Sequence, residues 1–373
     1  MIALRKWYAG KRVLVTGHTG FKGAWLTAWL RDMGALVTGL SLPPSDGEPS
    51  LFHDARLAAD IDSRVGDIRH AGVLERVVRE TKPELVLHLA AQSLVRRSYR
   101  QPAETFETNV MGLVNLFEAL RQSAGVRAVM VVTSDKCYEN REQVYRYRED
   151  DPMGGHDPYS ASKGCAELVT AAYRRSYFAR AGVHVGSGRA GNVIGGGDWS
   201  EDRLVPDLMR GAARDQPVLI RNPDAVRPWQ HVLDPLHGYL LLTRALAERG
   251  ESFAEGWNFG PSEDDAVPVR EIVAMLQHHW PRVRIVEERA DNAPHEAGLL
   301  ALDATKAAER LGCLPLLRLP QALAWTAAWY REFFAGSASA SGLVAADLAR
   351  YESLALDAGG TAPSVAYAAE VGH

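Results

Sequence analysis

A glycine-rich turn between a short strand and a helix constrains the fold of this chain more than any other feature. Residues 12–16 form a β-branched run typical of a strand, and residues 24–33 carry the apolar stripe of a helix. Glycines permit a tight turn that a ligand can approach closely, and the helix N-terminus adds unpaired N–H groups suited to a pyrophosphate. Glycines alone would also fit a purely structural turn, but the spacing G-x-x-G-x-x-G in this context favours dinucleotide binding. The predicted residues of the turn are Gly17, His18, Thr19, Gly20, Phe21, Lys22 and Gly23.

The first half of the chain continues the alternation of strand-like and helix-like segments. The strands predicted after the turn are 36–40, 85–89, 128–133 and 183–189, and the predicted helices are 71–80, 103–122 and 160–180. Each parallel strand needs a crossover element before the next one, so this order predicts a doubly wound parallel sheet. We therefore expect an α/β Rossmann-type domain over residues 1–190, completed by return segments near 230–260.

The second half of the chain loses this regular alternation. Residues 191–229 and 261–334 contain loops and short helices, which predict a smaller mixed α/β substrate-binding lobe. The last strong helical pattern covers 319–334. Beyond it the chain is rich in Ala, Gly and Ser, so residues 335–373 are predicted to form a linker and a weakly ordered tail.

Composition argues against several classes of function. The chain has 42 Lys and Arg residues and 46 Asp and Glu residues, and this net charge of −4 lacks the basic field that nucleic-acid binding needs. The longest apolar runs are strand-sized, and no secretory signal precedes the first strand. The three cysteines, Cys137, Cys165 and Cys313, lack paired ligand spacing. We expect a cytoplasmic protein with reduced thiols, no metal and no membrane or nucleic-acid partner.

The residues after the second and third strands bear on the choice of cofactor. The strand at 36–40 ends without the carboxylate that usually holds the NAD ribose, and without an arginine for an NADP phosphate. NAD is favoured by the missing cation, with Ser41 as a ribose partner. Asp67 follows a third short strand and either reaches the adenine amino group or caps the helix that begins at 71. Ile68, Leu89, Ala90 and Ala91 complete the predicted cofactor site.

Two polar motifs predict the catalytic groups. Tyr159 and Lys163 lie one turn apart at the start of a long helix, where the ammonium would lower the phenol pKa from about 10. Such a pair is common by chance, but Ser134, Asp135 and Lys136 directly follow the strand at 128–133. In a doubly wound sheet, chemistry gathers at the carboxyl ends of the strands. We expect Ser134 to orient a substrate hydroxyl beside Tyr159, and Asp135 with Lys136 to transfer protons; a solvated turn is the alternative.

Four segments, taken together, resemble one family closely. They are 133–138, 159–168, 191–199 and 227–233, and they resemble the CDP-glucose 4,6-dehydratases in order and spacing across residues 1–334. The resemblance implies an NAD-dependent lyase that converts CDP-glucose into CDP-4-keto-6-deoxyglucose and water through internal oxidation and reduction. It also implies substrate contacts from Asn192, Arg203, Leu204, Arg221, Arg227, Asn258 and His295.

The resemblance also implies a role for each catalytic residue. Tyr159 takes the proton of the sugar 4-hydroxyl, Asp135 protonates the departing C6 hydroxyl, and Lys163 helps to hold the nicotinamide ribose. The related dTDP-glucose dehydratases place Glu at the position of Lys136 as the C5 base. We hypothesise that Lys136 is the base, which requires a neutral amine and hence a lowered pKa. His156 stands where the family pattern has tyrosine, next to the predicted sugar site.

Two alternatives remain open on the residues alone. A nucleotide-sugar epimerase or decarboxylase would use Tyr159, Lys163 and Ser134 but has no use for Asp135 with Lys136. A non-catalytic NAD-binding regulator would need none of these groups. The nucleotide base and the sugar rest on the resemblance, because no residue by itself identifies cytosine.

The helices predicted at 103–122 and 160–180 also favour a homodimer or homotetramer. They carry more apolar side chains than one face of a sheet needs, and the matching helices of extended relatives pair into a four-helix interface; alternatively, both simply cover the sheet. These side chains are Phe106, Val110, Leu113, Leu116, Phe117, Leu168, Val169, Ala172 and Tyr173.

Overall fold

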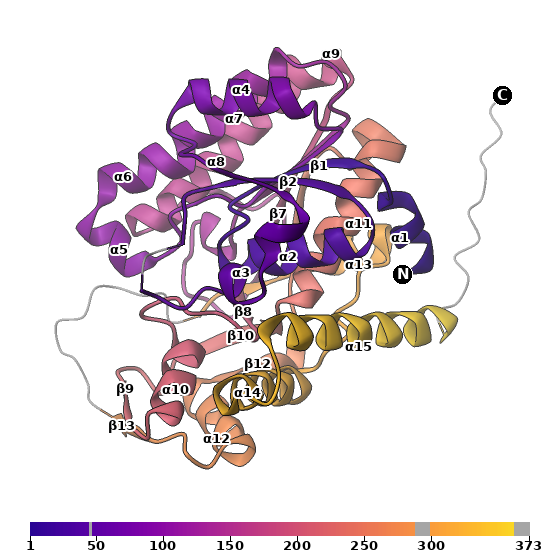
Figure 1. Cartoon of the computed structure of the whole chain (residues 1–373). Helices are drawn as coiled ribbons and strands as arrows, with labels where there is room; N and C mark the ends of the chain where they lie inside the picture. The colour runs from indigo at the N-terminus through magenta and orange to yellow at the C-terminus, as the bar shows by residue number, and fades with distance from the viewer. Residues whose placement is uncertain (45–46, 288–298, 362–373) are drawn as a thin grey trace.

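A seven-stranded parallel sheet forms the centre of the molecule (Figure 1). The computed structural model describes residues 1–44, 47–287 and 299–361. The strands lie in the order β11-β7-β5-β4-β1-β2-β3, and each neighbouring pair is parallel, which confirms the predicted doubly wound sheet. Their bounds are β1 (Arg12–Thr16), β2 (Leu36–Ser41), β3 (Asp62–Val65), β4 (Leu85–His88), β5 (Ala128–Val132), β7 (His184–Ala190) and β11 (Gly256–Phe259).

Helices cover both faces of this sheet. Successive side chains of a strand point to opposite faces, so Val13 and Val15 pack into one apolar cluster while Leu14 joins another. The first cluster includes side chains of α2 and α11, and the second includes side chains of α4, α7 and α8. In Figure 1, α2 and α11 lie on one side of the sheet and α4, α7 and α8 on the other. The covering helices are α1 (Ile2–Tyr8), α2 (Phe21–Asp32), α4 (Ala71–Thr81), α7 (Gly112–Arg121), α8 (Pro158–Tyr173) and α11 (Leu233–Arg249).

Both long predicted helices contain a π-helical turn. The segment predicted at 103–122 comprises α6 (Pro102–Phe106), a π-helical turn at Glu107–Met111 and then α7. The segment predicted at 160–180 comprises α8, a π-helical turn at Arg174–Phe178 and α9 (Ala179–Ala181). The remaining short elements of this domain are α3 (Leu51–Asp54), α5 (Val95–Arg100) and 3-10 turns at Leu57–Asp60, Asp135–Cys137 and Gly250–Phe253. None of the described helices combines the length and the apolar character needed to cross a membrane.

A smaller lobe lies at the lower side of the sheet domain in Figure 1. Its strands are β8 (Asn192–Ile194), β10 (Val226–His231) and β12 (Ala266–Pro268) in one sheet and β9 (Val218–Ile220) with β13 (Ile285–Glu287) in another; its helices are α10 (Leu204–Ala213), α12 (Val269–His279) and α14 (Leu319–Ala335), with a 3-10 turn at Glu263–Asp265. Part of the region predicted for this lobe lies elsewhere. Helix α13 (Thr305–Leu311) packs against α11 and β11, because Lys306 donates to the Gly256 carbonyl and Arg310 pairs with Glu255. Strands β6 (Arg146–Tyr147) and β14 (Ala301–Leu302) pair in parallel and so join a segment that precedes β7 to a segment that follows β13.

The prediction of a weakly ordered C-terminal segment is wrong for residues 340–361. They form helix α15 (Ala340–Thr361), which lies beside α14 and α2 (Figure 1). The Ala-rich composition hid an apolar stripe, in which Val344, Leu348 and Tyr351 are buried. The helix is also held by polar contacts, since Tyr351 donates to Asp234 Oδ1 at 2.9 Å and Glu352 accepts from Trp29 Nε1 at 2.8 Å.

The docking of α15 predicts a measurable loss of stability in Tyr351→Phe. The substitution keeps the ring but leaves the buried Asp234 carboxylate short of a donor, so the free energy of unfolding is expected to fall by about 1–3 kcal/mol. Ser353→Ala, two residues away on the exposed side, is the matched control and is expected to stay within about 0.5 kcal/mol of wild type. Urea unfolding measures both. Equal unfolding curves for Tyr351→Phe and wild type would show that α15 is not docked through this tyrosine.

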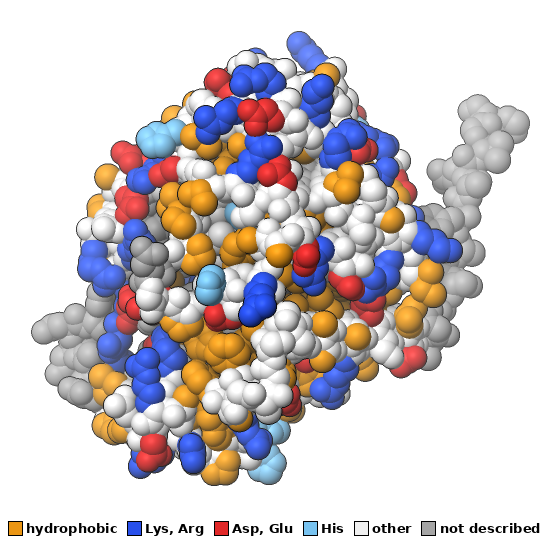
Figure 2. All heavy atoms as spheres, viewed as in Figure 1, with side chains coloured by type: hydrophobic (Ala, Val, Ile, Leu, Met, Phe, Trp, Pro, Cys, Tyr) orange, Lys and Arg blue, Asp and Glu red, His pale blue; other side chains and the backbone are white. Residues whose placement is uncertain are grey.

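On the face shown in Figure 2, basic and acidic side chains are interspersed over both parts of the molecule. Hydrophobic side chains gather near the middle of this face, between the sheet domain and the lobe.

Candidate active site

A cavity of about 1000 Å³ lies where the carboxyl ends of the central strands face the lobe. Such an edge, where loops from several parallel strands converge, is the usual ligand site of a doubly wound fold. Of the predicted site residues, those that line the cavity are Gly17, Thr19, Gly20, Phe21, Lys22, Gly23, Ser41, Asp67, Ile68, Leu89, Ala90, Ala91, Ser134, Asp135, Lys136, Tyr159, Lys163, Asn192, Arg203, Leu204, Arg221 and Arg227. The structure thus brings both predicted motifs and most of the predicted substrate contacts into one space.

The glycine-rich turn has the backbone that a pyrophosphate needs. Gly17 has a φ of +77°, and a Cβ there would lie 2.6 Å from the backbone nitrogen of Ala90. A Cβ on Gly23 would lie 2.0 Å from the Gly17 carbonyl oxygen, so glycine is required at both positions. The N-cap residue of α2 is Gly20, which has no side chain to cap the first N–H groups of the helix. This turn therefore fits a dinucleotide pyrophosphate at the N-terminus of α2.

Two predicted residues do not line the cavity, and a third, His295, lies outside the described residues. His18 is buried, with Nε2 2.9 Å from Ser63 Oγ, and burial lowers its pKa to about 4. Asn258 is also buried, and its amide donates to the carbonyls of Tyr147 and Asp303. These hydrogen bonds join β11 to the segments that carry Tyr147 and Asp303. The positions of His18 and Asn258 differ from the prediction. Periodicity and resemblance identified the segments that carry these residues but not the direction of their side chains.

The structure excludes one of the two roles considered for Asp67, the capping of helix α4. Helix α4 begins at Ala71 with His70 as its N-cap, so Asp67 does not cap it. Its carboxylate instead accepts hydrogen bonds from the backbone and guanidinium of Arg69, at 2.6–2.9 Å. Arg69 also lines the cavity and was not identified from the sequence. Ser41 Oγ lies 2.8 Å from Thr19 Oγ1.

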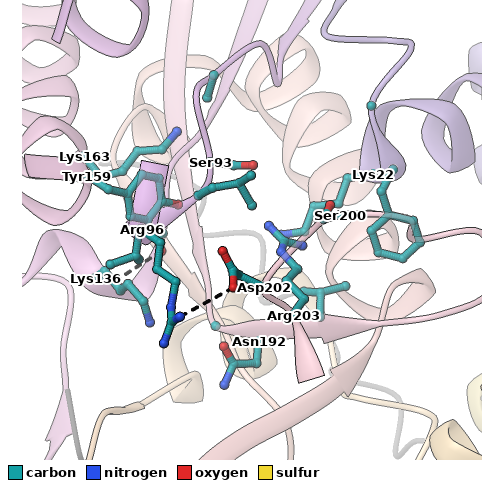
Figure 3. Close-up of a pocket in the computed structure, with 18 of the residues that line it drawn as sticks. Lys22, Ser93, Arg96, Lys136, Tyr159, Lys163, Asn192, Ser200, Asp202 and Arg203 are labelled. Carbon is teal, nitrogen blue, oxygen red and sulfur yellow. Dashed lines mark hydrogen bonds and ion pairs between the residues drawn. The ribbon is translucent and has the colours of Figure 1, made fainter. Parts of the chain in front are cut away.

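The catalytic groups are placed by the start of α8 and by the turn that follows β5. Asp157 accepts from the backbone of Ser160 at 3.0 Å and thereby caps α8, while Pro158 occupies its first turn. Tyr159 is therefore fixed at the cavity wall, which Ser134 also lines. Ser134 Oγ in turn donates to Asp135 Oδ1 at 2.9 Å and accepts from the Lys136 backbone at 3.3 Å. Figure 3 shows Tyr159, Lys163 and Lys136 on one side of the cavity, opposite Lys22, Ser200 and Arg203.

The pKa of the Tyr159 phenol is shifted in the direction opposite to the one predicted. Burial raises the pKa of Tyr159 to about 12, against the lowering effects of the Ser134 hydrogen bond and the Arg203 charge. Lys163 was expected to lower the pKa of Tyr159, but its ammonium donates to the Val132 carbonyl at 3.3 Å, and burial lowers the pKa of Lys163 itself to about 8. In this structure, desolvation of the phenolate outweighs the nearby charges.

A buried ion pair that the sequence did not reveal supports this site. Glu167 lies one turn beyond Lys163 and pairs with Arg189 at 2.8 Å; both side chains are at most 6% exposed. Glu167 also accepts hydrogen bonds from Thr133 and Ser187, so it joins α8 to β5 and β7. Because all of its oxygens are satisfied, the pair can hold the catalytic helix against the sheet. The sign of this pair in the sequence was the carboxylate of Glu167, one helical turn after Lys163.

The lobe adds a second group of charged side chains. Arg203 NH1 lies 3.2 Å from Asp198 Oδ2, and Asp198 is buried. Lys22 of the glycine-rich turn faces them, and burial, followed by the Arg203 charge, lowers its pKa to about 7. The sequence did not single out Asp198, Ser200 or Asp202, because nothing local predicted that they would meet the glycine-rich turn.

Comparison with known proteins places this site in a family. Residues 14–324 match the family model described as GDP-mannose 4,6 dehydratase. The CDP-glucose 4,6-dehydratase of Salmonella typhimurium is 50% identical over 337 residues, which cover 89% of this chain and 94% of that protein.

Solved structures agree on the fold. The UDP-glucose 4-epimerase of Thermotoga maritima superposes with a TM-score of 0.75 at 25% identity and covers 86% of this chain and 98% of that one. A dTDP-glucose 4,6-dehydratase double mutant from Streptomyces venezuelae, solved with NAD, has a TM-score of 0.72 at 28% identity and covers 87% of this chain and 98% of that one. The family match spans the glycine-rich turn, the catalytic residues and most of the lobe. The chain therefore belongs to the family of nucleotide-sugar 4,6-dehydratases.

Proposed function

We propose that this protein is an NAD-dependent lyase that converts CDP-glucose into CDP-4-keto-6-deoxyglucose and water in the cytoplasm. The observation that carries the proposal is the meeting of Tyr159, Ser134, Asp135 and Lys136 with the glycine-rich turn in one cavity. An epimerase needs a base and a serine at C4 but no acid and base at C5 and C6. The choice of CDP-glucose over other nucleotide sugars is supported by the 50% identity to the Salmonella typhimurium enzyme.

The first step asks Tyr159 to remove the proton of the sugar 4-hydroxyl. When bound, NAD would supply a hydride acceptor for C4 and a hydride donor for C6, and its nicotinamide ring would add positive charge to the cavity. The phenol needs such positive charge nearby, because burial raises its pKa to about 12. Ser134 lies between Tyr159 and Asp135 and positions the sugar hydroxyl. Lys163 and the glycine-rich turn would hold the cofactor.

The second step eliminates water from the 4-keto sugar. The ketone acidifies the C5 hydrogen, so Lys136 removes it as a proton while Asp135 donates a proton to the departing C6 hydroxyl. Both side chains follow Ser134 on the same 3-10 turn and line the cavity. A proton then returns to C5 as C6 is reduced, so the sugar ends with no net oxidation.

If Lys136 is the C5 base, Lys136→Met is expected to slow exchange of the C5 hydrogen with solvent deuterium by about 100-fold or more, since a positioned base contributes about 10²–10⁴. Oxidation at C4 is expected to continue, because Tyr159 and Ser134 are untouched. Mass spectrometry of recovered sugar measures the exchange, and Lys136→Glu is the matched rescue, since a carboxylate can accept the same proton. Undiminished exchange in Lys136→Met would assign the base elsewhere.

The overall proposal is tested by incubating the protein with CDP-, dTDP-, UDP- and GDP-glucose and adding strong alkali. A 4-keto-6-deoxy sugar then develops an ultraviolet band, which is expected with CDP-glucose. An epimerase would change the sugar without the band, and a regulator would leave every sugar unchanged. If the band develops only with another nucleotide sugar, the proposed dehydration stands, but the choice of cytosine as the nucleotide base is overturned.

We also propose that the protein assembles through the outer face of α6 and α8. Of the predicted interface residues, Leu113, Leu116 and Phe117 are buried against the sheet and therefore belong to the core. Phe106, Met111 and Leu168 are 37%, 51% and 60% exposed, an apolar surface that a second copy would cover. Light scattering measures the assembly state, and a monomer would contradict the proposal.

A further inference from the structure

Two arginines from opposite sides of the cavity meet one carboxylate. Arg96 lies on α5 in the sheet domain, and its NH1 is 3.5 Å from Asp202 Oδ1. Arg221 lies just after β9 in the lobe, and its NH1 is 3.9 Å from the same oxygen. All three residues line the cavity, and Figure 3 shows Arg96 and Asp202 facing each other inside it. The Asp202 carboxylate therefore connects the two walls of the site.

The loop that carries Asp202 is anchored just before its tip. Arg210 of α10 donates to the carbonyls of Trp199 and Ser200, at 2.7 and 3.2 Å. The Trp199 ring packs against aromatic rings of α14, with the Tyr330 ring centroid at 5.2 Å. These contacts fix the loop as far as Ser200, whereas Glu201 and Asp202 are exposed. The loop is thus anchored on the N-terminal side of Glu201 and Asp202.

The backbone at Asp202 also favours a tip that can change conformation. Its φ is +55°, in the left-handed region, which most non-glycine residues avoid. Asp tolerates this region better than most residues, but the conformation still needs contacts to hold it. The ion pairs with Arg96 and Arg221 are contacts of this kind.

Asp202 differs in burial and pairing distance from Asp198, the other carboxylate that pairs with an arginine at the site. Asp198 pairs with Arg203, but its side chain is 3% exposed and also accepts from the Ser200 backbone at 3.1 Å. The Asp202 side chain is 35% exposed and pairs at longer distances. A long, part-exposed pair is weak, so an incoming anion can replace Asp202 more readily than Asp198.

We propose that Asp202 holds Arg96 and Arg221 in place of a substrate phosphate, and that the diphosphate of the nucleotide sugar displaces it on binding. Guanidinium groups bind phosphate oxygens through paired hydrogen bonds, which are stronger than the pairs that Asp202 makes here. Arg96 then becomes a substrate-binding residue of the sheet domain, opposite Arg221 of the lobe. The inference rests on the proposed function, since it needs a nucleoside diphosphate in this cavity.

The test is calorimetric binding of CDP to the full-length protein and to Asp202→Asn. Removing the competing carboxylate is expected to tighten CDP binding about 3- to 10-fold, the range that two part-exposed ion pairs provide. Glu201→Gln removes the same charge from the neighbouring position and is the matched control for the general field. Its effect is expected to stay below about 2-fold, as for a screened surface charge. In an Arg96→Gln and Arg221→Gln background, Asp202→Asn is expected to have no further effect.

The outcomes separate this inference from the proposed function. If wild type binds CDP and Asp202→Asn binds it no more tightly than Glu201→Gln does, Asp202 is not a competitor and the inference is wrong. The inference is equally wrong if Asp202→Asn tightens binding to the same extent with both arginines replaced. If folded wild-type protein does not bind CDP at all, the proposed function is overturned, and the inference with it. Thermal unfolding of each variant confirms that it is folded.

Discussion

Tyr159→Phe is expected to retain the cofactor and to lose catalysis. The substitution removes the one oxygen that is proposed to take the proton of the sugar 4-hydroxyl, at the cavity wall that Ser134 also lines. A positioned acid–base group contributes about 10²–10⁴ to the rate, so we expect turnover to fall by about 1000-fold or more. The change in turnover is measured by product formation from CDP-glucose, and retention of the cofactor is measured by NAD titration.

The control for this variant is Tyr145→Phe, which removes the corresponding hydroxyl from an exposed tyrosine. That hydroxyl donates to Asp151. Its turnover is expected to match that of wild type. Unchanged turnover in Tyr159→Phe would remove the basis for the enzymatic interpretation. Loss of NAD binding along with turnover would instead give this tyrosine a mainly structural role at the cofactor.

Asp135→Asn is expected to separate the two halves of the reaction. The amide can still accept the hydrogen bond from Ser134, but it cannot supply the proton that the departing C6 hydroxyl needs. We expect elimination to slow by about 10²–10⁴. Oxidation at C4 is expected to continue, because Tyr159 and Ser134 are untouched. The near-ultraviolet absorbance of reduced cofactor therefore accumulates after mixing with CDP-glucose.

Asp150→Asn is the matched control for this variant, since it makes the same change at an exposed turn. It is expected to turn over as wild type does, without accumulation of reduced cofactor. If Asp135→Asn slows C4 oxidation and elimination equally, Asp135 acts through Ser134 and Tyr159, and the general acid lies elsewhere.

Local pattern was sufficient for the main architecture of this protein. The strands near 12, 36, 85, 128 and 183 and the helices between them follow from apolar periodicity, and that order of elements predicts a parallel sheet. The position of the candidate site follows as well, because the carboxyl ends of parallel strands meet at one edge. The glycines of the turn could be recognised from their spacing, and Gly23 is required by backbone atoms of the same segment, whereas a Cβ on Gly17 would meet Ala90 on a distant one.

Side-chain direction, by contrast, was decided by tertiary packing. His18 sits inside the glycine-rich turn yet packs beneath it, and Asn258 ends its strand facing Tyr147 and Asp303. Helix α15 depends on α2 and α11, more than 100 residues earlier in the chain, for the partners of Tyr351 and Glu352.

The sequence by itself determined the sheet, the turn and the identity of the catalytic motifs, since each depends on residues close together in the chain. Only the tertiary structure decided the ionisation of Tyr159 and the meeting of Arg96 with Asp202 across the cavity. The physical reason is that burial and charge pairing depend on segments distant in sequence. Desolvation raises the pKa of a phenol only once the whole cavity wall has closed around it.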